Sequence, residues 1–156
     1  MTVDEILSTK GTHVVTTTPD TPAEAAARVL MEQRVGALPV VEGDEVIGVF
    51  AERDLVRAIA ERGADALRLP VRQLMIAPME TCRPDSPIQE VMRRMTASRL
   101  RHLLVVDAEG LCGIVSIGDV VKHRLREAET EAGVLRDYIT VTRSPVIHTD
   151  VHRDSA

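Results

Sequence analysis

The sequence predicts a mixed α/β protein built from two β-α-β-β-α units packed with pseudo-twofold symmetry. The main observation is an internal repeat, because residues 16–57 align without a gap on residues 81–122, at an offset of 65. A repeat of this length indicates two copies of one supersecondary unit. Each copy also shows a helix start, an apolar hairpin and a second helix start that carries an aspartate. We therefore expect sites to form in pairs where the two copies meet.

Each copy opens with a short apolar stretch and a turn, at residues 14–22 and 79–87. Thr21 and Ser86 begin matching capping boxes, each followed by proline at the first helical position. We predict that the first helices end at about Arg34 and Arg99. Apolar residues at helical spacing mark their inward faces. These residues are Ala26, Val29, Leu30, Ile88, Val91, Met92 and Met95.

A hairpin follows each of these helices. Its strands are predicted at residues 38–41 and 46–50 in the first copy, and at 103–106 and 111–115 in the second. The strands are almost entirely apolar, which is typical of strands covered on both faces. A second helix is predicted over residues 52–61 in the first copy, with Leu55 and Ile59 inward. Its counterpart starts near Gly118 and continues to Tyr138.

The expected domains are repeat 1 at residues 1–65, repeat 2 with its long last helix at 66–140, and a flexible tail at 141–156. A unit of about 60 residues is near the lower limit for a sufficient core of its own, so we expect the two copies to share one core. The segment 71–75 echoes residues 3–7, which gives each copy a lead-in segment.

Composition excludes several function classes. The formal net charge of −5 argues against broad binding of nucleic acid, and one Phe, one Tyr and no Trp leave no aromatic platform for stacking bases. The apolar runs are too short to span a membrane, and no signal peptide is evident, so we expect a cytoplasmic protein without a membrane partner. Cys82 and Cys112 are isolated and are expected to be small buried thiols.

The end of each hairpin carries the polar residues of interest. In the second copy Ser116 ends the strand and Asp119 lies in the first turn of the next helix, where free backbone N–H groups attract an anion. One carboxylate can accept hydrogen bonds from the two neighbouring hydroxyls of a ribose. Ser116 and Asp119 are equally explained as a capping box. In the first copy Ala51 has no side-chain oxygen for capping, yet Asp54 keeps its place, although a helix dipole could favour it there.

The pattern around these residues resembles that of the CBS domain. It runs from Gly36-Ala37-Leu38-Pro39-Val40 to Asp54, and again from Arg101-His102-Leu103-Leu104-Val105 to Asp119. The chain is similar to a stand-alone bacterial CBS-domain pair, or Bateman module, over roughly residues 1–140. The resemblance implies two units packed through their sheets and joined into a homodimer. It also implies a non-enzymatic regulatory module that binds AMP, ADP, ATP, NAD or S-adenosylmethionine and needs no other cofactor.

The resemblance also implies roles for single residues. Asp119 and Asp54 would hold ribose hydroxyls, Ser116 would contact ribose or phosphate, and the surroundings of Leu103 and Leu38 would sandwich adenine. Thr81 and Thr16 would line the opposite wall, and Arg53 and Lys10 would reach phosphates. The candidate ligand-binding residues are Lys10, Thr16, Leu38, Arg53, Asp54, Thr81, Arg101, His102, Leu103, Ser116, Ile117, Gly118 and Asp119.

The two copies differ where the family pattern is strictest. Ala51 replaces the Ser or Thr of the pattern in the first copy, and Arg101 and Leu104 replace its Gly and Pro in the second. These differences favour the Asp119 site. Nearby cations would suit a phosphate, or would form a solvated face. These cations are Arg99, Arg101, His102, Lys122 and His123.

Two hypotheses remain open on the sequence: a nucleotide sensor whose regulated protein is unknown, and an interaction adaptor with vestigial pockets that acts through dimerisation and its last helix. The chain has no phosphate-loop or dinucleotide fingerprint, and no catalytic triad can be nominated. His148 and His152 have the spacing of a helical metal pair, but the tail lacks helical periodicity, so no metal site is predicted.

Overall fold

The computed structural model describes residues 1–142 and divides into two units, the first ending at Val120 and the second beginning at Val121. The first unit holds both repeats, and α5 (Ile117–Thr142) starts in it. α5 extends past the predicted end at Tyr138. The predicted flexible tail lies mostly outside the described residues, as do His148 and His152.

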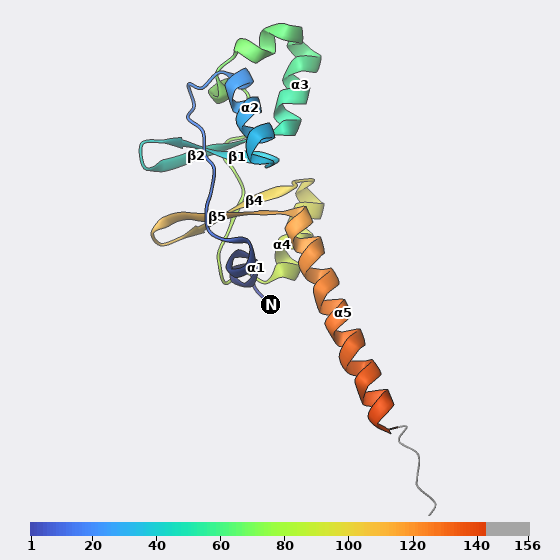
Figure 1. Ribbon diagram of the computed structural model, residues 1–156. Coiled ribbons are helices and arrows are strands. Elements are labelled where there is room, and N and C mark those ends of the chain that lie inside the picture. Colours follow the sequence, from blue (N-terminus) through green and yellow to red (C-terminus); the bar gives the residue numbers. More distant parts are fainter. Residues whose placement is uncertain (143–156) are drawn as a thin grey trace, which may run out of the picture. The chain divides into compact units, whose positions relative to one another are not determined.

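Each repeat folds as an α/β unit, which confirms the predicted fold class (Figure 1). The first contains α2 (Ala23–Gln33), the antiparallel strands β1 (Ala37–Glu42) and β2 (Glu45–Ala51), and α3 (Glu52–Arg62). The second contains β3 (Thr81–Cys82), α4 (Ile88–Ser98), β4 (His102–Asp107), β5 (Gly110–Ser116) and the start of α5. The two short 3₁₀ helices η1 (Gly63–Arg68) and η2 (Val71–Gln73) connect the repeats.

The hairpins of the two repeats have the same antiparallel strand pairing. In the second repeat β3 runs parallel to β4, and β4 runs antiparallel to β5. In the first repeat a single parallel bridge between Thr17 and Val40 takes the place of β3. Both hairpins also shift register at the same point, after Val40 and after Val105. The internal repeat therefore extends to the irregularities of the strands.

The helix starts differ from the predicted capping boxes. α2 and α4 have Pro22 and Pro87 as N-cap residues, and neither N-cap makes a side-chain capping bond. The Thr21 hydroxyl instead lies 2.7 Å from the Thr18 hydroxyl, and Ser86 Oγ accepts the Arg83 N–H at 3.0 Å. The capping-box prediction is wrong because proline holds the N-cap position and the hydroxyls close the preceding turn.

The helix ends and inward faces follow the prediction with one exception. Both first helices end at a left-handed arginine, Arg34 with φ 54° and Arg99 with φ 53°. In α3, however, Ile59 is exposed, and Ala58 is buried in its place. The helix presents the small residue to η1 and the core, so the predicted inward role of Ile59 is wrong.

The hydrophobic core is not one shared core, as the chain length had suggested, but two clusters. The cluster of the second repeat includes Val3, Ile6 and Leu7 of α1 (Val3–Lys10). The cluster of the first repeat includes Val71 and Leu74. Figure 1 shows α1 beside the second repeat's hairpin rather than beside α2. Each lead-in segment thus completes the core of the other repeat.

A glycine in each hairpin receives the exchanged segment. A Cβ built on Gly113 would lie 2.7 Å from Leu7 Cδ2, and one built on Gly48 would lie 2.7 Å from Met75 Sδ. Gly113 and Gly48 are equivalent in the repeat, as are Leu7 and Met75 in the lead-ins. The backbone of Ile76 also pairs with Val49 through bonds of 2.9 and 3.1 Å. The repeated glycines leave room for an apolar side chain that the other repeat supplies.

Candidate functional site

Asp119 lies in the first turn of α5 and forms a capping box with Ser116. Asp119 Oδ2 accepts the Ser116 N–H at 2.9 Å, and Ser116 Oγ accepts the Asp119 N–H at 3.1 Å. The local role that the sequence left open is therefore present. The capping box does not bury the Asp119 carboxylate, because the side chain of Asp119 is still 23% exposed.

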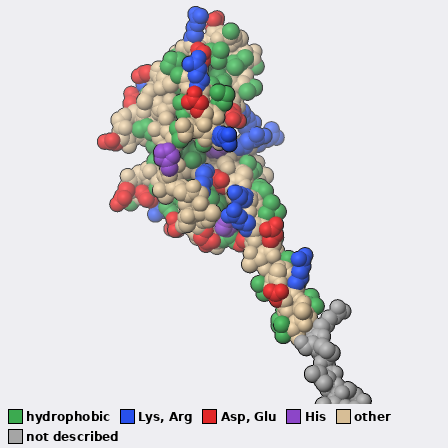
Figure 2. Space-filling model, viewed as in Figure 1, with side chains coloured by type: hydrophobic (Ala, Val, Ile, Leu, Met, Phe, Trp, Pro, Cys, Tyr) green, Lys and Arg blue, Asp and Glu red, His purple; other side chains and the backbone are tan. Residues whose placement is uncertain are grey.

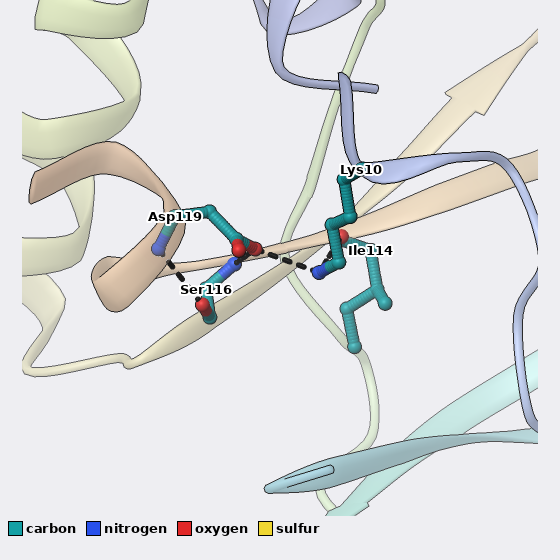
Figure 3. A network of polar contacts seen from close by, with 4 residues as sticks. All are labelled: Lys10, Ile114, Ser116 and Asp119. Atoms are coloured by element: carbon teal, nitrogen blue, oxygen red, sulfur yellow. Dashed lines mark hydrogen bonds and ion pairs between the residues drawn. The ribbon is translucent and has the colours of Figure 1, made fainter. Parts of the chain in front are cut away.

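Lys10, at the end of α1, contacts this cap. Its Nζ lies 2.6 Å from Asp119 Oδ2 and donates to the Ile114 carbonyl at 3.0 Å (Figure 3). Lys10 is the last residue of α1, which the second repeat's core holds in place. The lead-in exchange therefore brings a cation to the aspartate although the two residues are far apart in the sequence.

The ion pair keeps Asp119 charged. Burial raises the pKa of this carboxyl, but the Lys10 ammonium and the Ser116 N–H outweigh burial, so the pKa lies below its usual value. At neutral pH the site is an ionised carboxylate and an ammonium, both in partial contact with solvent. Such a pair can exchange its internal contact for a ligand that carries hydroxyl donors and an anionic group.

Asp54 occupies the equivalent place in the first repeat but is sealed. Its Oδ2 accepts the Ala51 N–H at 2.8 Å, and its Oδ1 pairs with Arg57 Nη2 at 2.9 Å. The side chain is 1% exposed, and burial raises its pKa despite these partners. Because both oxygens are engaged inside the protein, this carboxylate offers no surface to a ligand.

His102 and Arg101 lie beside the Asp119 pair. His102 is opposite Ser116 in the β4–β5 ladder, and its ring packs against Gly36 of the first repeat, since a Cβ there would lie 3.0 Å from it. Burial lowers the His102 pKa, as do Lys10 and Arg101, while Asp119 opposes the shift. The Arg101 carbonyl accepts the Ile117 N–H at 2.8 Å and so fixes the start of α5.

Arg53 links the two repeats. Its Nη1 donates to the carbonyl of Arg99 at 2.8 Å, which ties the start of α3 to the end of α4. The structure therefore holds the Arg53 side chain by a contact to the backbone of the second repeat.

The remaining predicted residues fall into different environments. Leu38 and Leu103 are fully buried in the two cores, so their side chains have no surface for an adenine. Thr81 pairs with Leu104 in β3, and Thr16 is exposed next to the Thr17 bridge. The structure brings together Lys10, Arg101, His102, Ser116, Ile117, Gly118 and Asp119, which form the start of α5 and its surroundings.

Two contacts of the site were missed on the sequence. Arg57, which seals Asp54, lies three residues further along a predicted helix, and this spacing alone indicates an ion pair. The Ile114 carbonyl that accepts from Lys10 had no sequence signal, because any residue can supply a backbone acceptor.

The fold defines a tandem α/β repeat protein in which two equivalent aspartates, Asp54 and Asp119, have unequal environments. A model of the CBS domain family matches residues 3–61 and again residues 71–126. The chain therefore belongs to the CBS domain family and contains a tandem CBS pair.

Known proteins whose names include the CBS domain resemble the chain. It is 32% identical over 148 residues to the mitochondrial CBS domain-containing protein CBSX3 of Arabidopsis thaliana, covering 88% of this chain and 71% of that one. A solved CBS-domain protein of Agrobacterium tumefaciens is 40% identical, with a TM-score of 0.78 over 80% of this chain and 99% of that one.

A third relative was solved with ligands. The CBS pair of protein MJ0100, described in complex with 5′-methylthioadenosine and S-adenosyl-L-methionine, is 22% identical with a TM-score of 0.71. The alignment covers 83% of this chain and 98% of that one. At this identity the likeness is one of fold.

Two kinds of feature are absent from residues 1–142. No helix in this range combines the length and the apolar character needed to cross a membrane. Within the same range, no three His, Cys, Asp or Glu side chains are grouped so that they could hold a metal ion.

Proposed function

We propose that the chain is a regulatory module, working as a homodimer, that binds one phosphate-bearing adenine nucleotide per chain at Asp119. The observation that carries the proposal is the partly exposed Lys10–Asp119 ion pair at the start of α5. Asp119 would accept the ribose hydroxyls, and the Lys10 ammonium, released from the carboxylate, would turn to a phosphate. His102 and Arg101 lie beside the same pair.

The two repeats differ in what they could offer such a ligand. Asp54 is sealed by Arg57, so the proposal places the ligand in the second repeat alone. The adenosyl ligands in the MJ0100 structure support the ligand class. The Lys10 ammonium beside Asp119 favours an anionic nucleotide over S-adenosylmethionine, because the same ammonium would repel a sulfonium cation.

Calorimetry tests this proposal with two matched variants. We expect Asp119→Ala to weaken binding of AMP, ADP, ATP or NAD by about 1.5–3 kcal/mol, which is about one to two decades in Kd. Asp54→Asn removes the carboxylate charge at the equivalent position in the sealed site and is expected to leave the affinity within about threefold. Equal affinity of Asp119→Ala and wild type would show that the assigned role is wrong.

An interaction adaptor is the second candidate, because α5 exposes Leu125, Leu135 and other large apolar residues. A thermal-shift series distinguishes the two. Stabilisation by an adenine nucleotide at millimolar concentration supports the sensor, whereas no stabilisation by AMP, ADP, ATP, NAD or S-adenosylmethionine supports the adaptor.

A further inference from the structure

The second unit of the chain carries a heptad pattern. Apolar residues recur at alternating steps of four and three along α5, which is the spacing of a coiled-coil seam. They are Val121, Leu125, Ala128, Ala132, Leu135 and Ile139. The family match ends at residue 126, whereas α5 continues to Thr142. Most of the heptad segment therefore lies beyond the CBS pair.

This stripe is exposed in the single chain. Val121 and Ile139 are each 49% exposed, Leu125 is 59% and Leu135 is 61% exposed. Figure 2 shows hydrophobic side chains reaching the surface between charged ones along this segment. Exposed apolar residues at coiled-coil spacing indicate a helical partner that covers them.

The charges that flank the stripe match those of a second copy in parallel orientation. With Leu125 at position a and Ala128 at position d, the e positions hold Lys122, Glu129 and Arg136, and the g positions hold Arg124, Glu131 and Tyr138. In a parallel pair each g residue faces the e residue five positions further on in the other chain. Arg124 then faces Glu129, and Glu131 faces Arg136.

The antiparallel alternative is less favourable. Its register that covers the whole stripe places Leu125 opposite Leu135 and Ala128 opposite Ala132. That register sets Glu129 against Glu129 and Glu131 against Glu131 of the other copy, and like charges at these positions repel. A shift of one heptad in either direction pairs opposite charges, but within residues 121–142 it leaves Leu135 and Ile139, or Val121 and Leu125, without an apolar partner.

We infer that residues 121–142 of two copies pair as a parallel two-stranded coiled coil. The alanines at positions 128 and 132 allow the two helices to approach closely at the middle of the seam. This inference rests on the homodimer in the proposed function but not on nucleotide binding. Calorimetry with ATP on the variants below therefore separates a failure of the coil from a failure of the ligand site.

Disulfide cross-linking of the full chain tests the pairing. In a parallel coil, residue 135 of one copy faces residue 135 of the other, so Leu135→Cys is expected to form a covalent dimer under mild oxidation. Val134→Cys is the matched control, because Val134 is 66% exposed but lies outside the stripe. Wild type, oxidised in parallel, gives the background from Cys82 and Cys112. The inference would be overturned if Leu135→Cys cross-linked no faster than Val134→Cys. It would also be overturned if, in a mixture of the two variants, Leu135→Cys cross-linked only to Leu125→Cys, as an antiparallel pair requires.

Charge exchange tests the orientation in the same Leu135→Cys background. Glu131→Arg places two cations opposite each other and is expected to slow cross-linking about tenfold. Adding Arg136→Glu restores the opposite pair in a parallel coil and is expected to restore the rate. Asp137→Arg makes the same charge change at the outer f position and is expected to leave the rate unchanged. A double variant no faster than Glu131→Arg alone contradicts the parallel pairing.

Discussion

Alanine at Gly113 tests whether the exchanged lead-in segments fix the fold. The added Cβ would lie 2.7 Å from Leu7 Cδ2 and 3.1 Å from Leu7 Cδ1. Ordinary carbon contacts are about 3.5–4.0 Å, so one group must move. Leu7 is buried and packed on its other sides, so we expect Gly113→Ala to lower the free energy of unfolding by about 1–3 kcal/mol.

Leu7→Ala provides the second arm of a double-mutant cycle. Alone it removes a buried side chain and is expected to cost about 2–5 kcal/mol. Together with Gly113→Ala it removes the atoms that the new methyl would strike, so the double variant should be more stable than the sum of the single effects by about 1 kcal/mol or more. Urea unfolding followed by far-ultraviolet circular dichroism measures each free energy. Additivity within about 0.5 kcal/mol would refute the proposed packing of Leu7 on Gly113.

The first repeat supplies a matched comparison. A Cβ on Gly48 would lie 2.7 Å from Met75 Sδ and 2.9 Å from the Ile76 carbonyl oxygen. That carbonyl is fixed by its hydrogen bond to the Val49 N–H. Met75→Ala should therefore rescue Gly48→Ala less than Leu7→Ala rescues Gly113→Ala, because a backbone atom cannot be removed by substitution.

Two further predictions concern titrating groups. Lys10→Met should raise the Asp119 pKa, because burial then acts with less opposition. A carboxyl whose folded pKa is depressed stabilises the fold above its unfolded pKa and loses that contribution as pH falls through the folded pKa. As pH is lowered, the Lys10→Met variant should therefore begin to lose stability at a higher pH than wild type does. An NMR titration of the carboxyl carbon measures the Asp119 pKa in both proteins. Arg28→Met, which removes a cation elsewhere on the surface, is the control. An unchanged Asp119 pKa in Lys10→Met would contradict the ion pair. Burial raises the pKa of Cys82 to about 11. A thiol reagent at about pH 8 should therefore modify Cys112 first, and should modify Cys82 only when the protein unfolds. Equally fast modification of both cysteines would contradict the burial of Cys82.

Much of the fold could be predicted from the sequence because its signals are local and occur twice. The apolar strands, the helix ends at Arg34 and Arg99, and the shared turns all depend on neighbouring residues. Periodicity shows which face of a segment is buried but not which repeat buries it. The exchange that places Leu7 against Gly113 was therefore missed, and one shared core was expected in its place.

The candidate site was predicted less completely. Asp119 and Ser116 were recognised because a short motif marks a helix start. Asp54 has the same place in its motif, but its accessibility depends on Arg57, so equal sequence positions gave unequal sites. The capping boxes at Thr21 and Ser86 failed because the following proline, rather than the hydroxyl residue, occupies the N-cap.

The exchange of lead-in segments also constrains how the chain is assembled during synthesis. Val3 and Leu7 are made before the first repeat, whereas the side chains that bury them, such as Val91 and Val115, are made after it. The nascent chain must carry these apolar residues uncovered while the entire first repeat is translated. The first repeat in turn lacks Val71 and Leu74 until the linker has left the ribosome. The first repeat can therefore complete its core once Leu74 has been made, whereas the core of the second repeat closes on α1 only after Val120 has been made.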